Sequence, residues 1–279
     1  MKEIIKHIRS QVAMNQEQFA AALGTTAITI NRWENGKSLP TKMAQASILR
    51  FCEERGIDLF GIVMESIIGQ NDEHLLYHGS KTGIVGTIAP ISRSMCDFGK
   101  GFYMGTNPLQ PLTLICDESK PVFYSLQFDM SNLKVLHVDV GIEWAMLIAF
   151  NRGYMDEVKG SAIYNRYAAM AKGYDVICGY IANDRMYRVM KDFFEKNITD
   201  TALIHSLHAL DLGTQYVAMN EKACANIKVV REYKLQPLEL ETLKRKSIRR
   251  REESIALTEG ILLQYRREGK YFDEIIRGE

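Results

Sequence analysis

Two short helical segments joined by a glycine turn constrain the fold of residues 1–69 most strongly. Asn15 is suited to begin the first segment as its N-cap. Gly24 is suited to end it, because glycine takes the left-handed conformation with little strain. Thr25 or Thr26 is expected to cap the second segment. The flanking stretches repeat apolar residues at helical spacing: Ile4, Ile5, Ile8 and Val12 before the pair, and Ala44, Ile48, Leu49 and Phe51 after it. We therefore expect an all-helical domain over residues 1–69.

The helical pair resembles the phage-repressor (Cro/C1-type) helix-turn-helix family over about residues 2–60. Three stretches carry the resemblance: residues 16–20 (QEQFA), residues 24–26 (GTT) and residues 30–36 (INRWENG). The resemblance implies that the helix after the glycine turn lies in the major groove of DNA, with its N-terminal side chains at base edges. The DNA-binding residues would then be Gln16, Thr26, Ala27, Ile28, Asn31 and Arg32.

The side chains at these positions differ in what they can bind. Arg32 can bind guanine through two hydrogen bonds, whereas Ala27 and Ile28 can only contact a thymine methyl group. Gln16, at a helix start, would touch a phosphate or a base edge. We expect a homodimer on a palindromic DNA site. The alternative is that the helical domain serves as a protein-docking or dimerisation unit.

Composition sets limits on the rest of the molecule. The 279 residues suffice for two domains, and the formal net charge of +1 means that any contact with nucleic acid must be local. The N-terminus is not a signal peptide, and no apolar run is long enough to span a bilayer. An odd number of scattered cysteines without a C-x-x-C pair argues for reduced thiols in a cytoplasmic protein and against a metal site: Cys52, Cys96, Cys116, Cys178 and Cys224.

After a polar junction at residues 70–73 the pattern becomes mixed. Helical and strand patterns follow one another without strict alternation, which indicates an α+β domain over residues 72–232. The tail, residues 233–279, is expected to be a helical extension. The strands are expected at Leu75–Tyr77, Gly101–Met104, Val122–Phe128, Val135–Val138, Tyr174–Gly179 and, as the last strand, Gln215–Ala218. Helices are expected at Ile142–Asn151, Asp184–Phe194 and Thr201–Leu210, and from Leu238 to about Arg267. The stretch Tyr154–Lys172 is expected to be largely helical.

Two glycine-containing motifs mark the α+β domain, one at Leu76–Ser80 (LYHGS) and one at Asp97–Tyr103 (DFGKGFY). Each places a ring-bearing residue beside glycine, and glycine lets the backbone approach a flat ligand closely. The pair therefore predicts a cleft for a planar, partly polar group.

These motifs resemble the NAD-binding core of ADP-ribosyltransferases of the diphtheria-toxin and poly(ADP-ribose) polymerase class. Residues 75–232 resemble more closely an uncharacterised bacterial domain family. Its further hallmarks match Glu143-Trp144, Asn151-Arg152 and the stretch from Asp175 to Asp184. The fold implied is ADP-ribosyltransferase-like, with NAD as substrate or ligand.

The resemblance implies roles for five residues. His78 would hydrogen-bond a ribose of NAD, with Ser80 nearby. The backbone of Gly79 would clamp the nicotinamide amide. Tyr103 would stack on the nicotinamide ring, and Gly101 would permit close approach. Such a clamp would orient the N-glycosidic bond for loss of nicotinamide.

The acidic residue of that family is missing at its usual place. Gln215 stands where a Glu is expected, and a neutral amide cannot supply negative charge or act as a base. Asp184 is the preferred substitute, since it lies in a turn after a buried strand; Glu221, six residues past Gln215, is the other. Chain elongation is not expected from such a site. The catalytic residues implied are His78, Tyr103, Gln215 and Asp184.

Two main hypotheses follow for the whole chain. One is a mono-ADP-ribosyltransferase joined to a DNA-binding domain. It would modify a protein or nucleic-acid acceptor and belong to toxin–antitoxin or phage-defence systems, with a small neutralising partner protein. The other is a transcriptional regulator whose inactive transferase fold senses NAD or a related nucleotide. A partner-docking module is a third reading.

Overall fold

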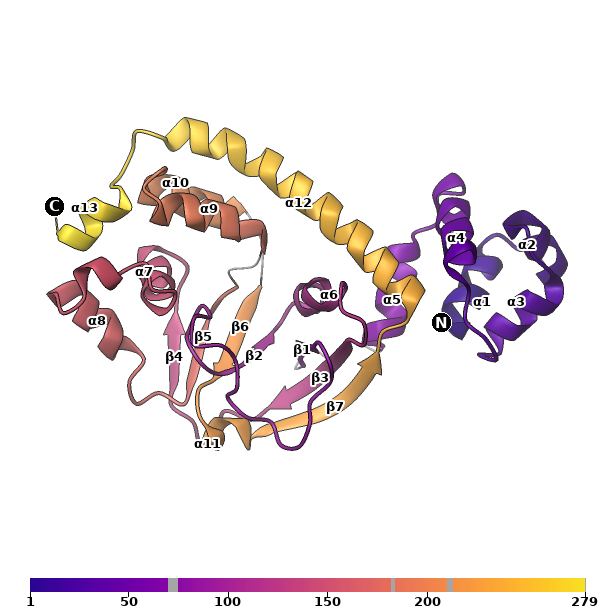
Figure 1. Cartoon of the computed structure of the whole chain (residues 1–279), viewed down its shortest axis with the longest axis horizontal. Coiled ribbons are helices and arrows are strands. Elements are labelled where there is room, and N and C mark those ends of the chain that lie inside the picture. The colour runs from indigo at the N-terminus through magenta and orange to yellow at the C-terminus, as the bar shows by residue number, and fades with distance from the viewer. Residues whose placement is uncertain (70–74, 182–183, 210–212, 279) are drawn as a thin grey trace.

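The computed structural model describes residues 1–69, 75–181, 184–209 and 213–278, except for the side chains of residues 184–187. The N-terminal region is helical throughout its described length, as expected, and forms one end of the molecule (Figure 1). Its helices are α1 (Lys2–Gln11), α2 (Gln16–Leu23), α3 (Ala27–Glu34), α4 (Lys42–Glu54) and α5 (Leu59–Ile68).

The boundaries of α2 and α3 follow the predicted signals. Asn15 and Gln18 form a capping box, in which the Asn15 side chain accepts from the Gln18 N–H at 2.8 Å and the Gln18 side chain accepts from the Asn15 N–H at 3.0 Å. Gly24 ends α2 in the left-handed conformation, with φ of 68°. The cap of α3 is Thr26, whose hydroxyl accepts from the backbone N–H of Thr29.

A mixed sheet forms the centre of the second region, which confirms the α+β class. The strand order is β4-β5-β6-β2-β1-β3-β7; β4 and β5 are parallel, and the other described pairings are antiparallel. The strands are β1 (Leu76–Ser80), β2 (Phe102–Gly105), β3 (Val122–Phe128), β4 (Val135–Val138), β5 (Val176–Tyr180), β6 (Thr214–Ala218) and β7 (Ile227–Lys234).

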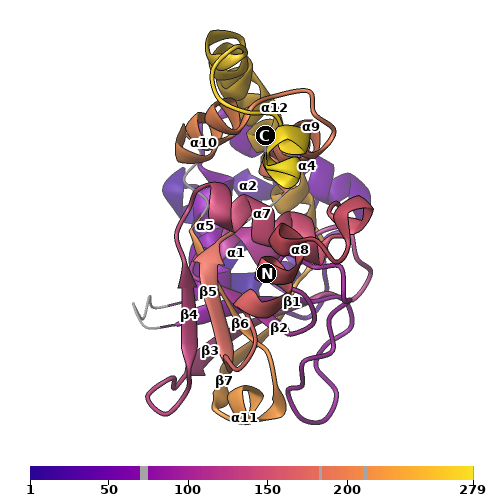
Figure 2. The same ribbon diagram turned by 90° about the vertical axis from the view of Figure 1, so that its left-hand side faces the viewer.

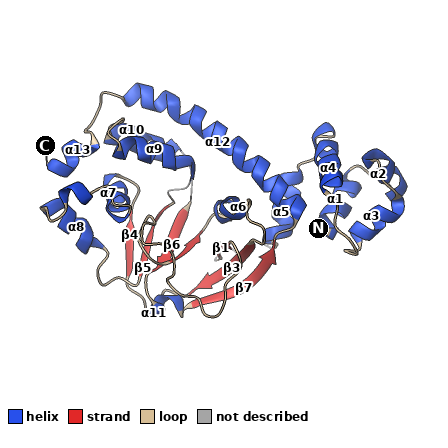
Figure 3. Ribbon diagram, in the orientation of Figure 1, coloured by secondary structure: helices blue, strands red, loops and turns tan. Residues whose placement is uncertain are grey.

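The sheet is nearly divided in its middle. Strand β1 pairs with β3 along its whole length, but its ladder with β2 consists of Tyr77 opposite Gly105. Beyond this bridge, residues 78–80 of β1 and 102–104 of β2 separate; we call this region the β1/β2 fork. Figure 3 shows the strands as two groups of different inclination, with β4, β5 and β6 in one and β3 and β7 in the other.

Helices cover the sheet and extend beyond it. Figure 2 shows α7 and α8 in front of the strands, and α12 above α9 and α10. The helical segments after β2 are α6 (Leu109–Ile115), α7 (Ile142–Asn151), a 3₁₀ turn (Asp156–Val158), α8 (Ala162–Met170), α9 (Asp184–Phe194), α10 (Asp200–Ala209), α11 (Glu221–Cys224), α12 (Pro237–Tyr265) and α13 (Phe272–Arg277).

One expectation about this region was wrong. The strand that contains Gln215 is not the last one, because β7 follows it and pairs with β3 at the edge of the sheet. The stretch 154–172 is largely helical, as expected, and consists of the 3₁₀ turn and α8, which are separated by Gly160 with a φ of 86°.

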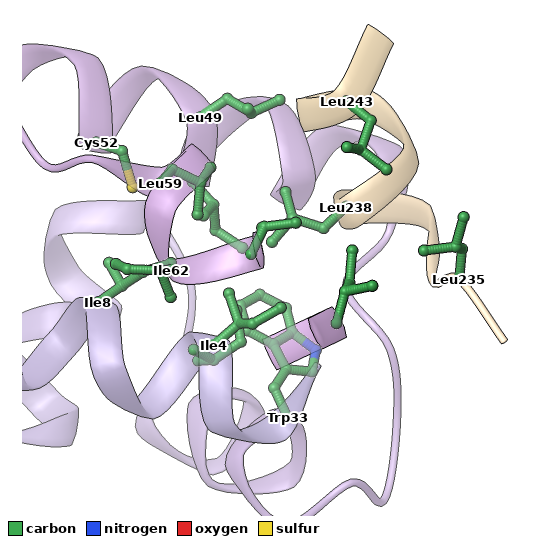
Figure 4. Close-up of a cluster of buried hydrophobic side chains, with 14 of the residues drawn as sticks. Ile4, Ile8, Trp33, Leu49, Cys52, Leu59, Ile62, Leu235, Leu238 and Leu243 are labelled. Carbon is green, nitrogen blue, oxygen red and sulfur yellow. The ribbon is translucent and has the colours of Figure 1, made fainter. Parts of the chain in front are cut away.

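One hydrophobic cluster joins the two regions. It contains the buried side chains of α1–α5 and continues through Leu235 to Leu238 and Leu243 at the start of α12. Figure 4 labels these three residues together with Ile4 and Leu59. Farther along, α12 packs against α6, α9 and α10. The helical N-terminal region is therefore packed onto the second region and not only linked to it by chain.

Candidate functional site

The outer face of α3 is open to solvent. We call α3 the recognition helix, because it is the helix predicted to lie in the major groove. Thr26, Asn31 and Arg32 are exposed, and Ile28 has 74% of its surface exposed. Ala27 is half-buried. The opposite side of α3 packs into the core through Ile30 and Trp33. The helix thus presents the predicted DNA-binding side chains outward, at the end of the molecule farthest from the sheet (Figure 1).

Behind this face, Glu34 ties three helices together. Its carboxylate accepts from the Arg9 guanidinium at 2.6 and 3.3 Å and from the Gln16 side-chain amide at 2.7 Å. Gln16 in turn accepts from Asn31 at 3.4 Å. Burial raises the pKa of Glu34, but the bonds from Arg9 and Gln16 outweigh it, so that the net pKa is lowered. Gln16 is therefore oriented by the protein itself before any DNA arrives.

His78 lies in the β1/β2 fork. Its Nδ1 lies 2.7 Å from the backbone oxygen of Tyr103, and its ring stacks on Phe102 with centroids 4.4 Å apart. Because a carbonyl oxygen only accepts, Nδ1 carries the proton and Nε2 carries a lone pair. Burial lowers the pKa of His78, so the ring is neutral at pH 7. Among the described residues, Nε2 has no hydrogen-bond partner.

The glycines of both motifs are packed tightly by the protein. A Cβ on Gly79 would lie 2.8 Å from the carbonyl oxygen of Pro111 in α6, and one on Gly101 would overlap Val217 of β6. The nearby hydroxyl of Ser80 accepts from the Gly83 N–H at 3.0 Å. The absence of a side chain at Gly79 and Gly101 is therefore explained by the close packing of α6 and β6 against them.

Tyr103 is fixed by its own loop. Its hydroxyl donates to the carbonyl oxygen of Gly99 at 2.7 Å and accepts from the Phe98 N–H at 3.0 Å. Burial and, secondarily, the charge of Asp97 raise the pKa of Tyr103. The register places the Tyr103 side chain on the face of the sheet opposite His78. The structure joins these two residues through the Tyr103 backbone, while their rings lie apart.

Gln215 belongs to a buried polar cluster on the Tyr103 face. Its Nε2 donates to Asp97 Oδ2 at 3.3 Å and to the backbone oxygen of Tyr180 at 2.8 Å. The other carboxylate oxygen of Asp97 is paired with Arg152. The Asn151 side chain donates to the Asp97 backbone oxygen at 3.0 Å. An acid, an amide and a guanidinium therefore converge next to the loop that holds Tyr103.

Comparison with protein families places the second region. A family described as protein of unknown function (DUF3990) matches residues 74–252, which reach from β1 into α12. The chain belongs to this family. A helix-turn-helix family matches residues 5–45, from α1 into α4, and indicates that this domain binds DNA. Neither the curated proteins nor the solved structures provide a match to the chain.

In the DUF3990 domain, the remaining acidic candidates lie elsewhere. Asp184 begins α9, but its side chain and residues 182–183 are outside the described part of the structure. Glu221 is exposed at the start of α11, beyond the end of β6 that is distant from Gln215. The described carboxylate that contacts Gln215 is that of Asp97.

Sequence reasoning overlooked the role of Asp97 in the DUF3990 domain. From the sequence, Asp97 stood out only as the first residue of the DFGKGFY motif, and Arg152 only as part of the Asn151-Arg152 hallmark. Arg152 is the residue that ends α7, and its guanidinium reaches back to Asp97. The sequence signal that could have revealed this pair is an acidic residue at the start of a glycine-rich motif, Asp97, together with a basic residue directly after an apolar helix, Arg152.

Two histidines of α10 also have structural partners. His205 stacks on Tyr265 of α12 at 3.9 Å, and His208 shares a hydrogen bond with the Ile204 carbonyl oxygen. Within residues 1–69, 75–181, 184–209 and 213–278, no group of three His, Cys, Asp or Glu side chains is arranged to hold a metal ion. None of the helices in this part of the chain combines the length and apolar character that a membrane span requires.

Proposed function

We propose that the protein binds DNA through the recognition helix and binds NAD at the β1/β2 fork of its DUF3990 domain. The observation that carries the proposal is the state of His78. Its ring is neutral, its Nδ1–H is held by the Tyr103 carbonyl oxygen, and its Nε2 lone pair has no partner among the described residues. This arrangement is suited to accept a hydrogen bond from a ribose hydroxyl group.

The backbone of the fork supports a planar amide as the neighbouring group. Past the bridge between Tyr77 and Gly105, β1 has no ladder with β2. Strand-edge N–H and C=O groups can pair with a carboxamide in the same way as with another strand. Gly79 lies on this stretch of β1, directly beside His78, and its backbone is the group we propose for the nicotinamide amide.

Transfer of a single ADP-ribose is the enzymatic form of this proposal. The bond between nicotinamide and ribose would break, and nicotinamide would leave with the bonding electrons. A nucleophile of an acceptor would attack the ribose carbon and lose its proton to water. This form needs an anion near the ribose, because developing positive charge on ribose is stabilised by a nearby anion. The described carboxylate that bonds Gln215 is that of Asp97. A protein or nucleic-acid acceptor and a neutralising partner protein belong to this form.

Regulation of DNA binding is the second candidate, and the packing of α12 favours it. Helix α12 contacts α5 of the helix-turn-helix region and also α6, whose Pro111 carbonyl closes over Gly79. A ligand that moved α6 would therefore press on a helix that also supports the DNA-binding domain. Homodimerisation on a two-fold symmetric DNA site would be part of this regulatory form.

Nicotinamide release distinguishes the two forms. Purified full-length protein is incubated with NAD, binding is measured by calorimetry, and free nicotinamide is measured by chromatography. Binding with release, together with transfer of biotin-tagged ADP-ribose to an acceptor, supports the enzyme. Binding without release, and a change in DNA affinity on adding NAD, supports the regulator. Absence of binding at millimolar NAD refutes both forms.

His78→Ala is expected to weaken NAD binding, with His137→Ala as its matched control. His137 lies on the edge strand β4 and is exposed, so its loss should leave NAD affinity unchanged. Equal affinity in wild type and His78→Ala would contradict the placement of the ligand at the β1/β2 fork.

A further inference from the structure

The surroundings of residue 215 require a hydrogen-bond donor. Gln215 is 7% exposed and lies on β6 between Gly105 of β2 and Gly179 of β5. Its Nε2 faces the Asp97 carboxylate and the Tyr180 backbone oxygen. Both neighbours accept and neither donates, so both amide hydrogens are used. A glutamate in this position would face two acceptors, one of them charged.

This donor requirement also fixes the orientation of the amide. With Nε2 held by two acceptors, Oε1 must occupy the other branch of the side chain. Oε1 has no hydrogen-bond partner among the described residues, and no described side-chain oxygen is both fully buried and unpartnered. The amide therefore keeps an acceptor oxygen available in a fixed direction.

The negative charge next to this amide belongs to Asp97, which bonds the Gln215 side chain directly. Asp97 is 8% exposed, and its partners among the described residues include Arg152 at one carboxylate oxygen, Gln215 at the other, and Asn151 at the backbone oxygen. Such an array is costly to bury unless each group is satisfied, and these bonds compensate for the burial of the acid at residue 97 in this polar site.

We propose that Asp97 is the acid of this site and acts through Gln215 as a positioning residue. The acid and the amide have exchanged places relative to a site with glutamate on β6. Gln215 is thus the residue that the site requires, and restoring glutamate there would damage it. This inference rests on the proposed NAD site for its functional part, but the pairing of the two residues is testable without NAD.

The exchange is tested with Asp97→Asn, Gln215→Glu and the double variant. Gln215→Glu is expected to lower Tm by about 4 °C or more at neutral pH, since an unfavourable contact of this kind shifts Tm by several degrees in a chain of this size. The double variant should regain at least half of this loss, because the amide introduced at position 97 can donate to the carboxylate introduced at position 215. Independent effects would add, so an additive result overturns the proposal.

A pH profile separates charge pairing from simple packing. In Gln215→Glu, the charges facing the new carboxyl are those of Asp97 and Arg152, and the Tyr103 side chain lies on the same face of the sheet. Protonation turns the new carboxyl into a donor, so the loss of Tm should shrink as the pH falls. A constant loss would indicate a packing defect and would overturn the proposal. Should this variant not fold, Gln215→Met is compared, which removes the donor without adding charge. It should be the more stable of the two, and an equal failure to fold contradicts the proposal.

NAD affinity completes the test. Asp97→Asn and Gln215→Glu are each expected to weaken NAD binding about tenfold or more, and the double variant should lie closer to wild type than Gln215→Glu does. Failure of wild type to bind NAD would refute the proposed ligand, while the Tm measurements would still decide on the pairing. Wild-type affinity in Gln215→Glu would overturn the role assigned to Asp97.

Discussion

The imidazole of His78 and the backbone carbonyl of Tyr103 are joined by a 2.7 Å hydrogen bond that crosses the β1/β2 fork. At the preceding position along β1, Tyr77 still faces Gly105 of β2 in a normal ladder. The side chain of His78 therefore takes over a link between the strands where the ladder stops. Loss of this ring would leave a carbonyl oxygen without its donor in addition to removing the ligand-facing Nε2.

His78→Asn is expected to remove a pH dependence of stability. Burial lowers the pKa of His78 from its ordinary value of 6.5, so near that pH the unfolded chain binds a proton more readily than the folded one. The stability that this group contributes is present above pH 6.5 and is lost as the pH falls toward the folded pKa. Urea unfolding across this range should show a gap between wild type and variant that narrows at acid pH. A constant gap would contradict the buried, neutral ring.

Gly101→Ala should destabilise the domain by about 1–3 kcal/mol, because the added methyl overlaps Val217 and lies 3.0 Å from the Ala218 backbone oxygen. Chemical denaturation measures the loss. Gly260→Ala is the control: nothing lies within 4 Å of its Cβ, and alanine favours the helix by about 1 kcal/mol. Similar stabilities for the two variants would show that β2 and β6 are not packed as closely as described.

Glu34→Gln should cost about 1–3 kcal/mol of stability, since it weakens a charged hydrogen-bond pair that holds α1 and α2 to the recognition helix. DNA affinity should fall as well, because Gln16 loses its orienting partner. Unfolding measurements and DNA titration are compared with those of Glu17→Gln, an exposed position on α2. If Glu34→Gln bound DNA with wild-type affinity, the orientation of Gln16 by Glu34 would not matter for DNA binding.

Arg32→Ala should remove sequence discrimination on DNA while leaving stability unchanged. A base contact from arginine contributes about 1–3 kcal/mol to discrimination, and Arg32 is exposed at the end of α3. Affinities are measured for a sequence selected from random DNA by the wild-type protein and for an unrelated sequence. Arg188→Ala, which removes the same charge from α9, should keep the preference. Loss of preference in both variants would point to overall charge and not to the recognition helix.

Leu238→Ala should cost about 2–5 kcal/mol, because this side chain is fully buried in the cluster that joins the two regions. The shared cluster also predicts one unfolding transition for both regions, observable by calorimetry. Leu263→Ala, at a position with 68% of its surface exposed, is the control. Two separate transitions in wild type would contradict the continuous core.

The predictions that the structure confirms rest on interactions between residues close together in the sequence. The capping box at Asn15, the left-handed Gly24 and the Thr26 cap each act within a few residues, so α2 and α3 could be placed from the sequence. Helix α7, also bounded as predicted, is nearly all apolar and buried. The helix-turn-helix prediction rested on such signals.

Contacts between distant residues accounted for what was missed. Strand β7 alternates weakly because it lies at an edge and contains a bulge opposite Ser125 and Leu126, so its pattern resembles that of a polar loop. Asp97 and Gln215 are 118 positions apart, and no local pattern relates them. The same holds for the single bridge between β1 and β2, which only the three-dimensional pairing reveals.

The length of α12 has a consequence for how this chain can vary. Its 29 residues form a rod of about 43 Å with the helix-turn-helix region at one end and α10 at the other. Each inserted or deleted residue would rotate one end against the other by about 100°. Such a change would unseat either Leu238 or Tyr265 from its neighbours. The two ends of α12 must therefore keep their relative rotation about the helix axis. Insertions or deletions in α12 would be tolerated only when they add or remove close to a whole number of helical turns.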